Sequence, residues 1–95
     1  MKILALEIEK QNSTSEQFQH YANAEAEHVY KLHKLGKIRE IYFRGDQNSA
    51  VIILECKDVD EARIILDELP FVKNNLNTFD IIPLIPYDGF ERLFA

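Results

Sequence analysis

Hydrophobic and polar residues alternate in two different periods along the chain, and the change of period divides it into six elements. Four short stretches rich in aliphatic and β-branched residues predict strands: Ile3 to Glu9, Ile38 to Arg44, Ser49 to Cys56 and Asn77 to Ile85. Two stretches with apolar residues every three or four positions predict helices: Ser13 to about Leu35, and Asp58 to Leu69. The order β-α-β-β-α-β predicts a ferredoxin-like α+β fold, in which both helices cover one face of a four-stranded antiparallel sheet.

Local signals predict where the helices begin and end. Ser13 with Glu16 has the spacing of a capping box, and Asp58 repeats this logic at the second helix. Gly36 supplies a residue that readily adopts the left-handed conformation closing the first helix. Pro70 is expected to stop the second helix, because proline cannot continue one.

The polar run Gly45-Asp46-Gln47-Asn48 predicts a tight turn, so the second and third strands should form an antiparallel hairpin. Pairing Ile41 with Ile53 places Arg39 opposite Glu55, as a cross-strand ion pair. Pro83 in the last strand indicates an edge or a bulge, because proline has no N–H for the ladder.

The sheet is expected to have an apolar face that the two helices do not cover. Aliphatic residues occupy both sides of several strands, most clearly in the run from Val51 to Leu54. Such a face is larger than a monomer usually exposes, and a second copy related by two-fold symmetry is the simplest cover. We therefore expect a homodimer or larger homo-oligomer, with Phe90, Leu93 and Phe94 of the tail packing across the partner.

Composition narrows the class of protein. Ninety-five residues fit one domain, spanning residues 1–95. The net charge of −5 disfavours nucleic acid and anionic membrane surfaces as partners. Cys56 follows an apolar run and is interpreted as a small buried hydrophobe rather than a nucleophile. A single cysteine, no signal-peptide pattern and no transmembrane-length segment lead us to expect a cytoplasmic location.

Three segments resemble the muconolactone isomerase-like family: the runs 35–44 and 51–55, and Leu69-Pro70-Phe71. This family belongs to the dimeric α/β-barrel group, together with YCII-related proteins and small cofactor-free monooxygenases. The resemblance extends from about Glu25 to Leu84, although the stretch after Pro70 is slightly longer here. It implies a sheet-to-sheet dimer with a small pocket in each subunit. It does not by itself imply lactone isomerisation, since one fold carries several chemistries.

Glu25 is the leading candidate for chemistry. It falls on the apolar stripe of the first helix, where an unpaired carboxylate is costly, and His28 follows three residues later. Glu25 could orient His28 as a general base or accept a proton itself. The alternative is a structural salt bridge between Glu25 and Arg39 or Arg44.

Glu40, Tyr42 and Arg44 alternate along the second strand and therefore point the same way. Inside a dimer barrel they would form a polar floor, in which Arg44 holds a carboxylate and Tyr42 stacks or donates. Arg39 is a further candidate for holding an anionic substrate group. At an exposed sheet edge, the same residues would only be solvated.

The sequence does not favour a metal or an organic cofactor. His20, His28 and His33 share one helix at spacings of eight and five residues, which do not bring them to one ion. No glycine-rich phosphate loop or dinucleotide fingerprint is present. Two hypotheses follow: a cofactor-independent enzyme that acts on a small organic molecule by proton transfer or oxygenation, or a non-catalytic binding or assembly domain.

Overall fold

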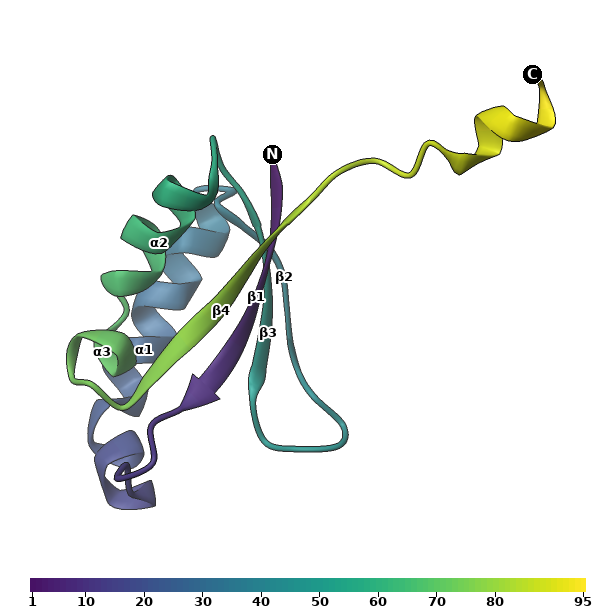
Figure 1. Ribbon diagram of the computed structural model, residues 1–95. Helices are drawn as coiled ribbons and strands as arrows, with labels where there is room; N and C mark the ends of the chain where they lie inside the picture. Colours follow the sequence, from purple (N-terminus) through teal and green to yellow (C-terminus); the bar gives the residue numbers. More distant parts are fainter.

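The computed structural model describes residues 1–95 and confirms the ferredoxin-like element order (Figure 1). In chain order the elements are β1 (Lys2–Glu9), α1 (Ser15–Lys34), β2 (Ile38–Phe43), β3 (Ala50–Glu55), α2 (Val59–Asp67), α3 (Pro70–Lys73), β4 (Asn77–Leu84) and the 3₁₀ turn η1 (Gly89–Leu93). The six predicted elements are all present, and α3 and η1 are additional. Figure 1 shows the α-helices as one layer on one side of the sheet.

The four strands form one antiparallel sheet in the order β2-β3-β1-β4. β4 is an edge strand, which explains how it accommodates Pro83. Alternation along the central strand β1 turns Ile3 and Ala5 towards the helices, and both are fully buried. Glu7 shares this face of β1, so a carboxylate lies beside the core.

The core is built between the sheet and the helices, as the sequence pattern predicts. Twelve buried residues form one cluster: Ile3, Ala5, Leu32, Ile38, Ile52, Leu54, Cys56, Ala62, Ile65, Leu66, Leu69 and Phe79. Most of them come from strand positions facing the helices and from the apolar stripe of α2. The predicted burial of Cys56 is confirmed.

The first helix begins one residue later than predicted. Thr14, not Ser13, is the N-cap, and Gln17 completes the capping box: the Gln17 N–H donates to Thr14 Oγ1 at 3.3 Å, and the Thr14 N–H donates to Gln17 Oε1 at 2.9 Å. The predicted box of Ser13 with Glu16 is therefore wrong. The Ser13 hydroxyl instead donates to the Leu76 carbonyl at 2.7 Å, which ties the start of the helix to the residue before β4.

Gly36, Asp58 and Pro70 mark helix ends as predicted, but only one of the two hydrogen bonds of a capping box forms at Asp58. Gly36 follows α1 with φ of +78°, and Asp58 caps α2 by accepting the Glu61 N–H at 2.8 Å. The second helix ends before Pro70, which then begins the short helix α3 at its first position.

The predicted register of the hairpin is wrong by one residue. Ile41 pairs with Ile52, not Ile53, in the register that continues from the turn, where the Arg44 N–H donates to the Ser49 carbonyl at 2.9 Å. The ladder then becomes irregular between Ile38 and Glu40. Arg39 lies in this irregularity and donates to the Gly36 carbonyl at 2.7 Å. The predicted ion pair with Glu55 is absent, and Glu55 instead binds the N-terminal ammonium at 2.8 Å.

The sheet face opposite the helices is apolar and uncovered, which confirms the pattern read from the sequence. None of its aliphatic and aromatic residues is buried: Leu4, Leu6, Ile8, Tyr42, Val51, Ile53, Ile82 and Leu84. Ile8 and Tyr42 keep 50% and 57% of their surface exposed. This surface is called the outer face below.

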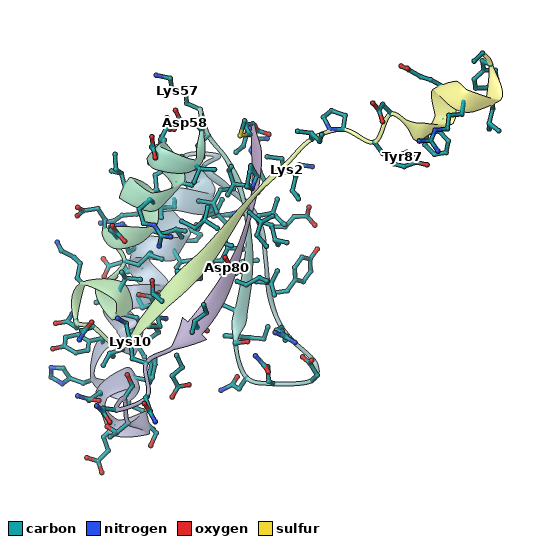
Figure 2. All side chains as sticks on the ribbon, viewed as in Figure 1. Lys2, Lys10, Lys57, Asp58, Asp80 and Tyr87 are labelled. Carbon is teal, nitrogen blue, oxygen red and sulfur yellow. The ribbon has the colours of Figure 1, made fainter.

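The segment after β4 extends away from the rest of the molecule (Figures 1 and 2). The molecule is consequently elongated, with extents of 57 × 29 × 20 Å. Phe90, Leu93 and Phe94 are exposed in this tail, and Tyr87 contacts Phe90 edge-on. No helix of the chain has the length and apolarity needed to cross a membrane.

Candidate functional site

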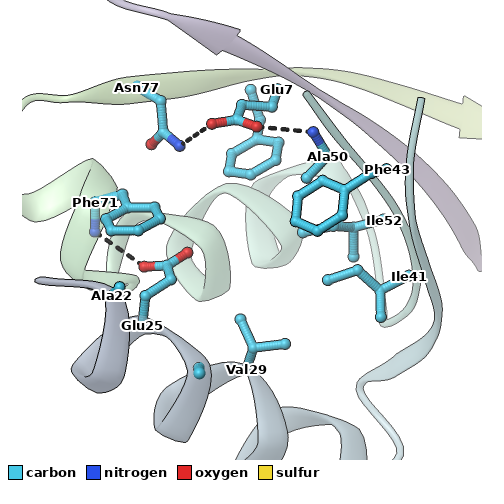
Figure 3. A pocket seen from close by; sticks show the side chains of 12 residues that line it. Glu7, Ala22, Glu25, Val29, Ile41, Phe43, Ala50, Ile52, Phe71 and Asn77 are labelled. Atoms are coloured by element: carbon cyan, nitrogen blue, oxygen red, sulfur yellow. Dashed lines mark hydrogen bonds between the residues drawn. The ribbon is translucent and has the colours of Figure 1, made fainter. Parts of the chain in front are cut away.

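A cavity of about 320 Å³ lies between α1 and the inner face of the sheet (Figure 3). Its volume is near the lower end of the range for small-molecule sites, about 300–1,000 Å³. Nine of its twelve lining residues are hydrophobic. The full lining is Glu7, Ala22, Glu25, Ala26, Val29, Ile41, Phe43, Ala50, Ile52, Phe71, Asn77 and Phe79.

The cavity exists because small side chains face one another across the layers. Ala22 and Ala26 stand one helical turn apart on α1, and Ala50 begins β3 opposite them. Larger side chains at these positions would fill the space as the aliphatic cluster fills the rest of the core. Phe43, Phe71 and Phe79 supply aromatic walls.

Glu25 projects from α1 into this apolar space (Figure 3). Its Oε1 accepts the backbone N–H of Phe71 at 3.0 Å, and its carboxylate has no other hydrogen-bond partner. Burial raises the pKa of Glu25 above its ordinary value; the Phe71 N–H opposes this shift, and the nearby charge of Glu7 adds to it. The carboxyl group therefore holds a proton more readily than a surface glutamate does.

Glu7 brings a second carboxylate to the cavity from β1. Its Oε1 accepts the Ala50 N–H at 2.7 Å, and its Oε2 accepts the Asn77 side-chain N–H at 2.7 Å. These bonds link β1 to β3 and β4 at the end of the sheet nearest the cavity. Asn77 is only 2% exposed, and its Oδ1 has no hydrogen-bond partner, so the amide is oriented by Glu7 alone.

The sequence interpretation missed Glu7 and Asn77. The available signal was the alternation along β1, which puts Glu7 on the same side as Ile3 and Ala5 and therefore facing the helices. Asn77 gave no comparable signal, because an asparagine at the start of a strand is an ordinary boundary residue.

The structure does not bring His28 together with Glu25. His28 is half-buried on α1, does not line the cavity and makes no hydrogen bond with Glu25. Glu25 also makes no ion pair with Arg39 or Arg44. The catalytic roles predicted for Glu25 and His28 stay predictions, but only Glu25 lies in the cavity.

The four predicted substrate-binding residues lie away from the cavity. Glu40 and Tyr42 are on the outer face, where the Tyr42 hydroxyl donates to Glu40 at 2.6 Å. Arg44 makes a two-pronged pair with Asp46 in the hairpin loop, at 2.9 and 2.7 Å. Arg39 is exposed in the strand irregularity. Their role in binding a substrate stays a prediction, and it depends on a second copy covering the outer face.

The chain offers no evident ligand set for a metal. No three histidine, cysteine, aspartate or glutamate side chains come close enough to hold an ion. Cys56 lies at the opposite end of β3 from Ala50, and burial raises the pKa of its thiol, which disfavours the nucleophilic thiolate.

Comparison with known proteins identifies the fold and no more. No protein-family model matches the chain, and no curated protein matches it. Among solved structures, it is similar to 5-chloro-2-hydroxyhydroquinone dehydrochlorinase from Burkholderia phenoliruptrix, solved in complex with 2,5-dihydroxybenzoquinone. The TM-score is 0.66 and the identity 18%, over 94% of this chain and 98% of that one. The alignment confirms the α+β architecture, whereas membership of the muconolactone isomerase-like family stays a prediction.

Proposed function

We propose that the chain is a cofactor-independent enzyme that binds a small ring molecule in the cavity and uses Glu25 to move a proton on it. The observation that carries this proposal is the position of Glu25: one oxygen is fixed by the Phe71 N–H, and the other is free in a largely apolar space. Apolar surroundings are what a functional carboxyl group needs to work as an acid or base near neutral pH.

The reaction class that fits best is isomerisation by proton transfer. A carboxylate removes a proton from a carbon next to a carbonyl group, and the same group returns it at another carbon, so no co-reactant is consumed. The reaction named for the structural neighbour, loss of hydrogen chloride from a hydroxylated ring, also requires a proton to leave the substrate. This likeness supports proton transfer over the oxygenation that the family resemblance also allows.

The non-catalytic alternative is a binding or assembly domain that holds the same ligand without turning it over. The sequence and the cavity are compatible with binding alone. The substitution Glu25→Gln separates the two hypotheses. Its neutral side-chain amide keeps a hydrogen-bond acceptor but cannot exchange a proton as a carboxyl group does.

The experiment is a solvent-exchange assay on candidate ring ketones and lactones in deuterated buffer, followed by NMR. We expect the wild-type chain to accelerate deuterium incorporation next to the carbonyl group, and Glu25→Gln to lower that rate by about 100-fold or more. Glu27→Gln, an exposed position on the same helix, should leave it unchanged. Equal rates for wild type and Glu25→Gln would exclude the proposed role and leave the binding domain.

We further propose that a second copy of the chain covers the outer face, as the sequence pattern predicts. A wide apolar sheet surface and an aromatic tail that extends away from the domain both support self-association. Light scattering at micromolar concentration should give at least a dimer. A monomer under these conditions would contradict self-association but would not test the role proposed for Glu25.

A further inference from the structure

We propose that the cavity selects an uncharged or cationic ring carrying an O–H or N–H donor and rejects organic anions, with Glu7 as the residue that sets this preference. The inference rests on the proposed function in taking the cavity as the ligand site, and it names the class of ligand. The sequence pattern instead suggested a substrate carboxylate bound by Arg39 or Arg44. Neither arginine lines the cavity.

The first observation is that the polar groups of the cavity are acceptors in excess. Two carboxylates, Glu7 and Glu25, and the amide of Asn77 are its only polar side chains. The side-chain amide of Asn77 already donates an N–H to Glu7. No lysine, arginine or histidine lines the cavity, so an anionic group would have no cation to meet.

The groove next to the cavity has the same character. A shallower groove adjoins the cavity and shares Glu7, Ala22, Phe43 and Phe71 with it. The groove adds Glu9 as its further charged residue and contains no basic side chain. The groove therefore adds a third carboxylate beside the two of the cavity and no cation.

Glu7 is the carboxylate of the cavity that accepts more hydrogen bonds. Both of its oxygens accept N–H donors, from Ala50 and Asn77, each at 2.7 Å. Such donors satisfy the ionised form of a carboxylate, and the orientation of Asn77 leaves its own Oδ1 without a partner. Glu25 can then accept a donor from the ligand with its free oxygen, while both oxygens of Glu7 stay bound to Ala50 and Asn77.

Size and shape limit the ligand to one ring with short substituents. An apolar cavity of about 150 Å³ holds benzene, and this one measures about 320 Å³. Phe43, Phe71 and Phe79 provide flat aromatic walls for a ring. Figure 3 shows the rings of Phe43 and Phe71 on opposite sides of the space into which Glu25 points.

Three probes of nearly equal size test the charge preference: benzyl alcohol, benzylammonium and benzoate, titrated by ¹H–¹⁵N NMR at about pH 7.5. Benzyl alcohol and benzylammonium should shift the amide signals of Phe71 and Ala50 at millimolar concentration. Benzoate should bind at least about tenfold more weakly than benzyl alcohol. Equal or tighter binding of benzoate, or no binding by the other two, would overturn the proposal.

Glu7→Gln tests the assignment to one residue. The amide oxygen introduced by this substitution can keep the Ala50 N–H, and Asn77 can turn its free oxygen to the new N–H. The ratio of benzyl alcohol to benzoate affinity should fall about tenfold towards one, whereas Glu27→Gln should not change it. An unchanged ratio in a folded Glu7→Gln variant would refute the role of Glu7. If Glu7→Gln does not fold, Glu9→Gln in the adjoining groove should still bring the affinity ratio closer to one, and an unchanged ratio would count against the proposal.

The binding test of the charge preference does not depend on whether the chain turns the ligand over. A charge preference without any effect of Glu25→Gln on solvent exchange would support this inference and exclude the proposed enzyme. Solvent exchange that depends on Glu25, together with a preference for benzoate, would support the proposed enzyme and exclude this charge preference.

Discussion

Replacing Ala50 by valine should stabilise the protein and weaken ligand binding at the same time. Ala50 is half-buried at the start of β3 and faces the cavity, so two additional carbon groups would enter empty space. At about 0.8 kcal/mol for each buried carbon group, the gain in unfolding free energy is at most about 1.6 kcal/mol. Valine is also well suited to a strand.

Ala5→Val is the matched control on the neighbouring strand β1. Ala5 is fully buried in the core and does not line the cavity, so the same two carbon groups have no space. Overpacking of this kind costs about 1–3 kcal/mol. One substitution, made at two positions on the same side of the sheet, should therefore change stability in opposite directions.

Urea denaturation measures both effects, and the melting temperature should move by about 4–8 °C for each kcal/mol in a domain of this size. The benzyl alcohol titration then tests the cavity, which Ala50→Val should make smaller. A destabilised Ala50→Val variant would show that the space beside β3 is already filled. Unchanged ligand affinity in a stabilised variant would show that the ligand binds elsewhere.

Three further predictions concern single side chains. Because the folded-state pKa of Glu25 is raised above 4.5, the stability of wild type relative to Glu25→Gln should be greatest below pH 4.5. This stability difference should fall as the pH rises through the raised pKa of Glu25. A stability difference that stays constant from about pH 4 to 8 in urea titrations would contradict the burial of this carboxyl group. Gly36→Ala should lower the unfolding free energy by about 1–2 kcal/mol; at φ of +78° its Cβ would meet nothing closer than 3.9 Å, so the cost is one of backbone conformation, and a neutral result would refute it. Asp58→Ala should cost about 1 kcal/mol through loss of the α2 cap, with Asp58→Asn as the variant expected to retain most of it.

The fold was predictable because its signals are local. The change between a period of two and a helical period marks the six main elements, and Gly36, Asp58 and Pro83 occupy the positions that their backbone chemistry requires. Signals that depend on a distant partner failed. Ser13 resembles a cap but bonds to Leu76, and the hairpin register differs by one residue from the predicted one.

The site was predictable only in part, for the same reason. Glu25 stands out in sequence because it interrupts an apolar stripe, and it does project into the cavity. His28 was paired with it by spacing along the helix, whereas the second carboxylate comes from Glu7 on another element. No spacing rule joins two residues through a tertiary contact. The cavity also depends on alanines, which give no signal of their own.

The central claim is that the space bounded by α1 and the inner sheet face receives a small ring whose donor group meets Glu25. A crystal structure of the chain soaked with benzyl alcohol tests it most directly. The ring should lie between Phe43 and Phe71, with its hydroxyl donating to the Glu25 oxygen that the Phe71 N–H does not occupy. A ring bound elsewhere, or side chains of a neighbouring copy filling the cavity, would contradict the account.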